Sequence, residues 1–440
     1  MYALRIRRSV LSCLWAAVVV TWPAFAFPQQ SSTPSPQSAA SPQAPAVEAL
    51  VERALARAPS LAARRARVDA AQNALRAAGT LPDPMIEFEY RDYNFPRYTI
   101  GSDPMSMAGA SIRQDLLSKG RRRAQRDVAQ AEIGERRAEQ DALATDLATQ
   151  VRVQYARLFA LDRERDTLAD ASQLAAMLAA TASSRYAAGQ ADQASVLRVQ
   201  LEQTQIGQRL IDIATERYAV QTALNRLTND PPDNPIGTIS ELPPDVPLPP
   251  GIAGPAVPET LTARAPEVVV RQREIELAGK QVNAAREELR PSWSVGGGLY
   301  WQGGLNRTVV FNVGIELPIR KDQRQRPLIA AAEQELRAAQ LELQNTTADV
   351  RAQIARLVAE WQAAGQQIDR YRTAILPQNS AAFDATRSSY LAGRGDFVSV
   401  LEEFRRWIEV RIDLASREAD RYTARARLDT LMRLSGGAGR

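Results

Sequence analysis

The chain has 440 residues, with 55 lysines and arginines against 50 aspartates and glutamates, 26 prolines, one cysteine and no histidine. Without histidine it has no imidazole general base, no Ser-His-Asp relay and no imidazole metal ligand. Its acids, serines and tyrosines are scattered without a convergent motif. We therefore expect no enzyme activity, no cofactor and no metal site.

Residues 1–26 have the pattern of a secretory signal peptide. Arg5, Arg7 and Arg8 precede an apolar run from Val10 to Trp22, and Ala24-Phe25-Ala26 supplies a small-residue cleavage site. The mature chain would then begin at Phe27. Removing these three arginines from 55 leaves 52 basic against 50 acidic residues. A chain this close to neutral predicts no binding to nucleic acid.

The only cysteine, Cys13, lies inside the apolar core of this leader. Removal of the leader would leave a mature chain without a disulfide, a thiol nucleophile or a zinc cluster. Val10-Leu11-Ser12-Cys13 also resembles a lipoprotein cleavage box. Acylation at Cys13 therefore stays open as an alternative.

Proline interrupts helices, so its distribution marks where long helices can form. Residues 27–45, rich in Pro, Ser and Gln, predict a flexible leader, and residues 230–257 predict a Pro-rich linker near the middle of the chain. Between Met105 and Asp230 there is no proline, and between Leu328 and Arg440 there is only Pro377. Long helices are therefore permitted in both halves.

The stretch from Arg121 to Tyr186 is dominated by strong helix formers. As one helix it would be roughly 100 Å long, at about 1.5 Å per residue. A second helix is predicted from Ser195 to Leu227, where apolar residues recur at spacings of three, four and seven: Ile206, Leu210, Ile213, Val220, Leu224 and Leu227. This seam is typical of a coiled coil, although a bundle helix fits the same periodicity.

The second half of the chain repeats the first. At an offset of 204, Arg185-Tyr186-Ala187-Ala188-Gly189 matches Ser389-Tyr390-Leu391-Ala392-Gly393, and Ser195-Val196-Leu197 matches Ser399-Val400-Leu401. This register predicts a tandem duplication, with a first repeat at 46–229, a second at 258–435 and a short tail at 436–440.

Each repeat also contains a region with the two-residue period of strands. In the second repeat we predict strands near 292–301 and 308–318, and in the first near 84–91 and 106–117. Apolar and polar or small residues alternate over nine or ten positions, which suits a transmembrane barrel strand. A soluble hairpin packed on helices is the alternative.

The mature sequence has no run of 18 apolar residues, so any membrane insertion must use these strands. About eight strands form the smallest barrel that closes, and four strands cannot. The chain must therefore oligomerise to insert, and three copies would supply twelve strands.

These features together resemble the TolC-type outer-membrane efflux proteins. The motifs are Leu81-Pro82-Asp83-Pro84 before the first strand, Ser118-Lys119-Gly120-Arg121-Arg122 after the second, Ile375-Leu376-Pro377-Gln378 in the later long helix, and the Tyr-x-x-Gly turns at 186–189 and 390–393. The Leu-Pro-Asp-Pro element resembles the heavy-metal (cation) branch of the family.

The resemblance implies a mainly helical fold with a membrane β-barrel portion, in which each repeat has a helix, a β-hairpin, a long helix and a returning helix. It implies a homotrimer whose twelve-stranded barrel contacts outer-membrane lipid and continues into an α-helical barrel in the periplasm. Such a protein is a passive exit duct that docks onto a periplasmic adaptor and an inner-membrane pump. The cargo is not implied.

Two groups of site residues follow from the resemblance. Ala188, Gly189, Ala392 and Gly393 would form the tips that contact the adaptor. Glu402 and Ser399 stand where the family has acids that narrow the closed periplasmic aperture, and Asp396 and Asp192 could supply further charge there. Both aspartates also suit the capping of the helices that follow them.

Two other classes of protein share part of this pattern. A periplasmic coiled-coil adaptor also has a long helical hairpin, but it normally has one, whereas this chain has two. A secreted coiled-coil structural protein would explain the heptads but not the duplicated β-hairpins. Fractionation with the outer membrane would distinguish the exit duct from both.

Overall fold

Two helical hairpins and one four-stranded sheet dominate the residues that the computed structural model describes, which are 44–92, 105–248, 258–302 and 307–433. All of them belong to one unit, Pro42–Arg440. The predicted signal peptide, nearly all of the predicted leader and the predicted tail lie outside the described residues. The predicted class, mainly helical with a small sheet, is confirmed.

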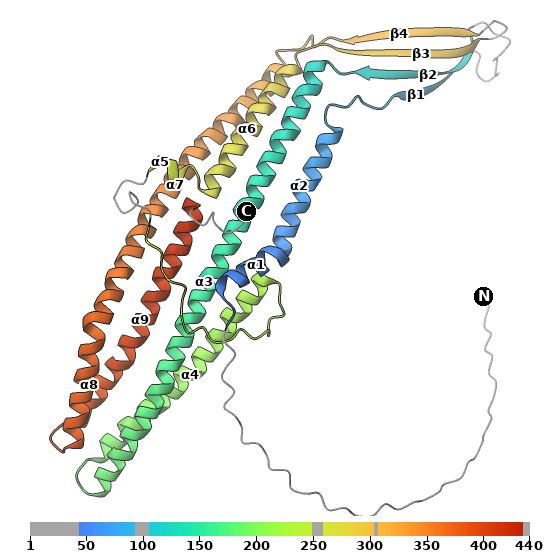
Figure 1. Ribbon diagram of the computed structural model, residues 1–440. Coiled ribbons are helices and arrows are strands. Elements are labelled where there is room, and N and C mark those ends of the chain that lie inside the picture. Colours follow the sequence, from blue (N-terminus) through green and yellow to red (C-terminus); the bar gives the residue numbers. More distant parts are fainter. Residues whose placement is uncertain (1–43, 93–104, 249–257, 303–306, 434–440) are drawn as a thin grey trace, which may run out of the picture. The chain divides into compact units, whose positions relative to one another are not determined.

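The elements follow the same order in both repeats (Figure 1). The first repeat contains α1 (Val47–Arg57), α2 (Pro59–Ala77), β1 (Met85–Arg91), β2 (Met107–Leu116), α3 (Lys119–Ala187) and α4 (Gln193–Thr228). The second contains α5 (Glu259–Thr262), α6 (Pro266–Glu287), β3 (Ser292–Gln302), β4 (Thr308–Glu316), α7 (Gln325–Arg370), the π-helix η1 (Tyr371–Ile375), α8 (Leu376–Leu391) and α9 (Phe397–Met432).

The long helix α3 runs unbroken for 69 residues. It begins at a capping residue, Ser118, whose hydroxyl accepts a hydrogen bond from the Arg121 backbone N–H at 3.1 Å. Its interior lacks proline and is rich in Ala, Leu, Arg and Glu, so nothing interrupts the helix before the turn at Gly189. α3 therefore connects the sheet directly to the far turn.

The matching helix of the second repeat is interrupted. Between α7 and α8 the backbone forms η1, and Pro377 follows within the first turn of α8. Proline has no N–H to donate to the carbonyl four residues earlier, that of Thr373, so the regular ladder is broken there. The predicted long helix thus contains a local π-helical turn that α3 lacks.

The four strands form one antiparallel sheet in the order β1-β2-β3-β4. Across it, Phe88 pairs with Ala110, Ala110 with Leu299 and Leu299 with Val309, so these residues share one face. That face is apolar and exposed, with Phe88 and Phe311 each 85% exposed. The opposite face carries Glu87, Glu89, Ser111, Arg113 and Asn312.

The helices pack through heptad seams. α3 contacts α4, α6 and α9, while α9 also contacts α7 and α8. On α4 the buried residues include Ile206, Ile213, Val220, Leu224 and Leu227, all from the predicted seam. Among the described residues no helix is both long and apolar enough to cross a bilayer.

The described part of the predicted linker, residues 230–248, is packed against both repeats; we call it the junction segment. Its Ile236 and Ile239 are buried. The Ile239 backbone N–H donates to the carboxylate of Asp162 in α3 at 2.9 Å. On the other side Asp245 accepts hydrogen bonds from Arg421 and Trp361. The junction segment thus connects α3 with α7 and α9.

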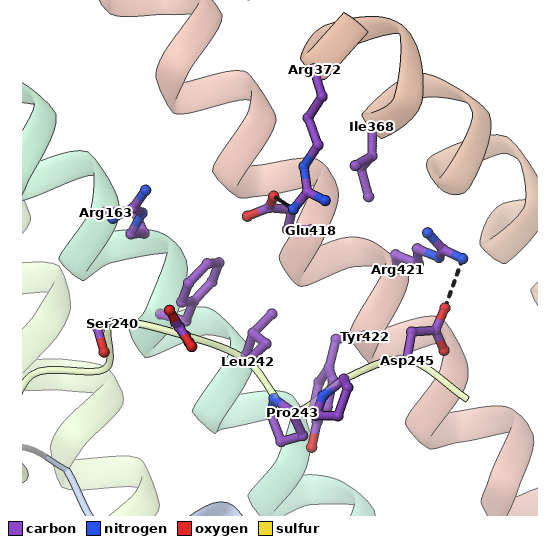
Figure 2. A pocket seen from close by; sticks show the side chains of 13 residues that line it. Arg163, Ser240, Leu242, Pro243, Asp245, Ile368, Arg372, Glu418, Arg421 and Tyr422 are labelled. Atoms are coloured by element: carbon purple, nitrogen blue, oxygen red, sulfur yellow. Dashed lines mark hydrogen bonds and ion pairs between the residues drawn. The ribbon is translucent and has the colours of Figure 1, made fainter. Parts of the chain in front are cut away.

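A pocket of about 490 Å³ lies beside the junction segment. Figure 2 shows Leu242, Pro243 and Tyr422 on one side of it, and Ile368 and Arg372 on another. Arg372 pairs with Glu418, and Arg421 with Asp245, so these lining charges are already balanced. The pocket separates the junction segment from the turn of helix that leads into η1.

Candidate functional site at the two hairpin turns

The two helical hairpins end in turns of the same geometry, on the side away from the sheet (Figure 1). At the first turn Gly189 has φ +69° and its N–H donates to the Tyr186 carbonyl at 3.0 Å. At the second, Gly393 has φ +76° and its N–H donates to the Tyr390 carbonyl at 3.0 Å. A positive φ is readily adopted by glycine, which explains the residue at both turns.

The two aspartates after these glycines are helix caps. The Asp192 carboxylate accepts a hydrogen bond from the Ser195 N–H at 3.0 Å and another from the Ser195 hydroxyl. These bonds hold the pKa of Asp192 below its usual value. Asp396 accepts from the Val398 N–H at 3.1 Å. Both residues therefore satisfy free N–H groups at the starts of α4 and α9.

The predicted tip residues Ala188, Gly189, Ala392 and Gly393 are all exposed. A side chain at position 189 would have no atom within 4 Å, and one at position 393 would come within 3.7 Å of the Arg185 guanidinium. The first turn is therefore the more open of the two. A groove between the hairpins is lined by Thr181, Ser184 and Arg185 on α3 and by Leu391 to Gly393.

Arg185 links the two turns. Its guanidinium donates a hydrogen bond to the Tyr390 carbonyl and lies 4.5 Å from the centroid of the Tyr390 ring. That ring is buried and packs on Phe397, with centroids 5.4 Å apart. Burial raises the pKa of Tyr390 above its usual value. Arg185 of the first hairpin thus binds the end of the second hairpin, through a hydrogen bond and a ring contact.

The predicted aperture residues of α9 face solvent. Ser399 and Glu402 are exposed and lie three positions apart, on one side of the helix. Within the described ranges Glu402 has no hydrogen bond or ion pair, whereas the neighbouring Glu403 is half-buried and pairs with Arg406 at 3.3 Å. Of these two glutamates, Glu402 is therefore the one whose carboxylate is free to interact with ions.

The structure brings the four tip residues to one end, with Asp192 at the start of α4 on the first hairpin and Asp396, Ser399 and Glu402 at the start of α9 on the second. Sequence reasoning missed the contact of Arg185 with Tyr390. The signal that could have revealed it is a charged difference within the matched turns, Arg185 against Ser389. The part of the chain that the structure describes has no group of three His, Cys, Asp or Glu residues placed to hold a metal ion.

The family model of the outer membrane efflux protein matches the chain over residues 50–230 and 257–432. The two matched ranges together cover most of the chain. Among curated proteins no sequence matched it.

Solved structures share the fold at low sequence identity. The outer membrane protein VceC from Vibrio cholerae has a TM-score of 0.74 and 19% identity, covering 88% of this chain and 95% of its own. CusC has a TM-score of 0.76 and 16% identity, covering 88% and 91%. The Campylobacter jejuni CmeC outer membrane channel has a TM-score of 0.74 and 13% identity, covering 93% and 94%.

These three structures match the chain with similar TM-scores. What they share with it is the whole arrangement of two helical hairpins and one small sheet, over nearly the full length of each chain. Together with the match over both repeats, this shows that the chain belongs to the outer membrane efflux protein family.

Proposed function

We propose that three copies of this outer-membrane efflux protein form one passive exit duct, which docks onto a periplasmic adaptor and an inner-membrane pump. The observation that carries the proposal is the sheet: its two outer strands, β1 and β4, each have one unpaired edge, and one of its faces is apolar and exposed. Lipid can solvate an apolar face but not an unpaired strand edge.

Pairing β4 of one copy with β1 of the next satisfies these edges. Three copies then close a barrel of twelve strands, with Phe88, Phe311 and Val313 toward lipid and Glu87, Arg113 and Asn312 toward the lumen. The helices that follow each hairpin would continue this barrel into the periplasm.

The tips are proposed to contact the adaptor. Ala188, Gly189, Ala392 and Gly393 are small and exposed and flank the groove beside Arg185. Small residues at a turn let a partner helix approach the backbone closely. Simple chain reversal, the alternative function of such a turn, needs the glycine but not the small neighbours.

Glu402 is proposed to line the periplasmic aperture. A threefold axis would bring three copies of its unpaired carboxylate together, and such a ring attracts cations. Ser399 lies on the same side of α9 and, being uncharged, would add no charge to this ring. Asp192 and Asp396 serve as helix caps and contribute to the local negative potential.

The chain is proposed to mature by loss of residues 1–26, leaving the leader 27–45, the two repeats 46–229 and 258–435, the linker 230–257 and the tail 436–440. No catalytic step is proposed, because the pump supplies the energy for export. Intact-mass measurement would decide the first residue, Phe27, against an acylated Cys13.

Cross-linking in mild detergent tests the trimer, and a monomer that still inserts into bilayers would contradict it. Gly189→Trp and Gly393→Trp test the tips. Each should abolish export while leaving the trimer yield largely intact, because the turns lie far from the sheet. Gly189→Asn is the matched control, since asparagine tolerates a positive φ and adds little bulk. Full export by both Trp variants would show that the adaptor binds elsewhere.

A further inference from the structure

The connection between β4 and α7 is longer and more exposed than its counterpart in the first repeat. Residues 317–324 join β4 to α7, whereas only residues 117 and 118 join β2 to α3. The shorter connection ends in Ser118, which caps α3. In the longer one Leu317 is 58% exposed and Ile319 86%. The second repeat thus has a segment that the first lacks, and we call residues 317–324 the rim loop.

The rim loop continues the apolar face of the sheet. On β4 apolar residues occupy every second position of that face, and Leu317 and Ile319 extend the same period beyond the end of the strand. Ile319 is the most exposed large apolar side chain in the described part of the chain. The next two, Phe88 and Phe311, lie on the apolar face itself. Exposure of this kind is unfavourable in water, so the lipid proposed to cover the face would also cover Ile319.

Two tryptophans mark the ends of the apolar face. Trp293 and Trp301 lie at opposite ends of β3 on that face, and each is about half exposed. Aromatic girdles lie at both interfaces of membrane barrels. Trp293, at the end that follows α6, pairs with Ile315 of β4. Since Ile319 comes four residues after Ile315, the rim loop would lie at the level of the lipid headgroups on the helix side of the membrane.

The rim loop also carries cations without a partner. Three of its exposed side chains form no hydrogen bond or ion pair with the described residues: Arg320, Lys321 and Arg324. The neighbouring Arg326 is paired with Asp322. The backbone holds the free cations together, because the Arg324 N–H donates to the Arg320 carbonyl at 3.0 Å. Residues four apart in such a helical turn lie on one side of it.

We propose that the rim loop binds the anionic headgroups of phospholipids in the inner leaflet of the outer membrane. Leu317 and Ile319 contact the acyl chains, and the three free cations bind the phosphates. The proposal rests on the trimeric duct proposed above, in which three rim loops surround one barrel. Long cationic side chains can keep their methylene stems in the apolar layer while their charged ends reach the headgroups.

The chemistry of the rim loop favours a lipid over a soluble anion. Guanidinium groups donate to phosphate oxygens in pairs, which suits Arg320 and Arg324 to this ligand. A free phosphate or the cell wall would satisfy the same cations, but it would leave Ile319 in water. Each cation close to an anionic membrane surface raises the affinity about fivefold. Three in one turn therefore distinguish an anionic lipid from a zwitterionic one.

A lipid-retention experiment tests the cations. The trimer is reconstituted in nanodiscs of phosphatidylethanolamine and phosphatidylglycerol in equal amounts and extracted into mild detergent, and the lipids that stay bound are identified by native mass spectrometry. The wild type should prefer phosphatidylglycerol. The rim-loop variant, Arg320→Gln with Lys321→Gln and Arg324→Gln, should lose this preference, by about fivefold for each cation removed.

The control variant removes three exposed cations that have no partner in the described residues and lie further along α7: Arg337→Gln, Arg351→Gln and Arg370→Gln. It should keep the preference. Equal retention by the wild type and the rim-loop variant, or equal losses in both variants, would overturn the proposal. So would a rim-loop variant that retains the lipid but no longer sediments with cell-wall sacculi. Arg320→Lys with Arg324→Lys keeps the charge and should keep most of the preference, and a loss as large as with Gln would contradict binding through charge.

A second experiment locates the apolar side of the rim loop. The expected mature chain has no cysteine, so Ile319→Cys, Phe311→Cys and Leu341→Cys each place one bimane label. Its quenching is compared between lipids that carry a spin label near the headgroup and iodide in water. The label at 319 should be quenched by the lipid and protected from iodide. The label at 341, on an exposed position of α7, should not be quenched by the lipid.

The label at 311 separates failure of this proposal from failure of the proposed function. If iodide reaches position 319 as readily as position 341 while position 311 is quenched by lipid, the rim loop does not contact the membrane but the sheet does. If iodide also reaches position 311 freely, or if no trimer forms, the proposed duct itself is wrong.

Discussion

The carboxylate of Asp162 is fully buried in α3 and accepts a hydrogen bond from Arg217 Nε at 2.7 Å. The same arginine donates to the carbonyls of Ile236 and Gly237, and Asp162 also accepts from the Ile239 N–H. One buried ion pair thus joins α3, α4 and the junction segment. Because every partner is satisfied, this network fixes the path of the chain between the repeats.

Asp162→Ala should destabilise the protein by about 3–5 kcal/mol, since it leaves the Arg217 charge without its partner in a largely buried position. Guanidinium unfolding followed by circular dichroism measures the change. Glu276→Ala is the control, because Glu276 forms an exposed ion pair with Arg273 worth about 0–1 kcal/mol. Equal losses in both variants would contradict the role assigned to the network.

The sequence identified the junction as Pro-rich but not as packed. Proline excludes helix, which is a local property, whereas the burial of Ile236 and Ile239 depends on Asp162, more than seventy residues earlier. By contrast, the alternation from Trp293 to Trp301 is itself the physical cause of β3, because each second residue reaches the same face. Features with a local cause were predictable, and those that depend on distant contacts were not.

Phe311→Arg should reduce insertion into the outer membrane, because it places a charge on the exposed apolar face of the sheet. The cost of an arginine near the bilayer midplane is about 2–4 kcal/mol per copy. Asn312→Arg, one residue further and on the opposite face, should insert normally. The amount of each variant in the outer-membrane fraction is the measurement, and equal amounts would contradict the assignment of the two faces.

Glu402→Gln should reduce the cation preference of the channel and weaken its block by divalent ions added from the periplasmic side. Three unpaired carboxylates would be lost per trimer. Glu403→Gln should have a smaller effect, because Glu403 lies about 100° further around α9 and is already paired with Arg406. Reversal potentials in planar bilayers distinguish the two, and equal shifts would place the constriction elsewhere, with Asp396 the next residue to test.

Stability should fall above pH 10 through Tyr422. Burial raises the pKa of Tyr422 from 10.0 to about 12. The unfolded chain therefore releases this proton first as the pH rises, and the stability contributed by the neutral phenol is lost between pH 10 and 12. The loss is about 2–3 kcal/mol. Tyr422→Phe should unfold with a shallower pH dependence over this range, and an unchanged slope would contradict the assignment.

Only the site residues that belong to local motifs were predictable from the sequence. Gly189 and Gly393 are required by the backbone, so their role in the turns follows from residue type alone. The cap made by Asp192 follows from its place three residues before Ser195. The contact of Arg185 with Tyr390 does not, because it joins residues 205 positions apart on different hairpins. No local pattern specifies that an arginine near the first turn contacts a tyrosine near the second turn.

The pairing of β2 with β3 has a consequence for the order of assembly. Leu116 of β2 lies opposite Trp293 of β3, so β2 pairs with a strand that leaves the secretion channel much later than itself. Until β3 arrives, the edge of β2 that pairs with it is free, and unpaired strand edges promote aggregation. We therefore expect a periplasmic chaperone to protect this edge until β3 arrives, and cells that lack such a chaperone should accumulate this protein as protease-sensitive aggregates.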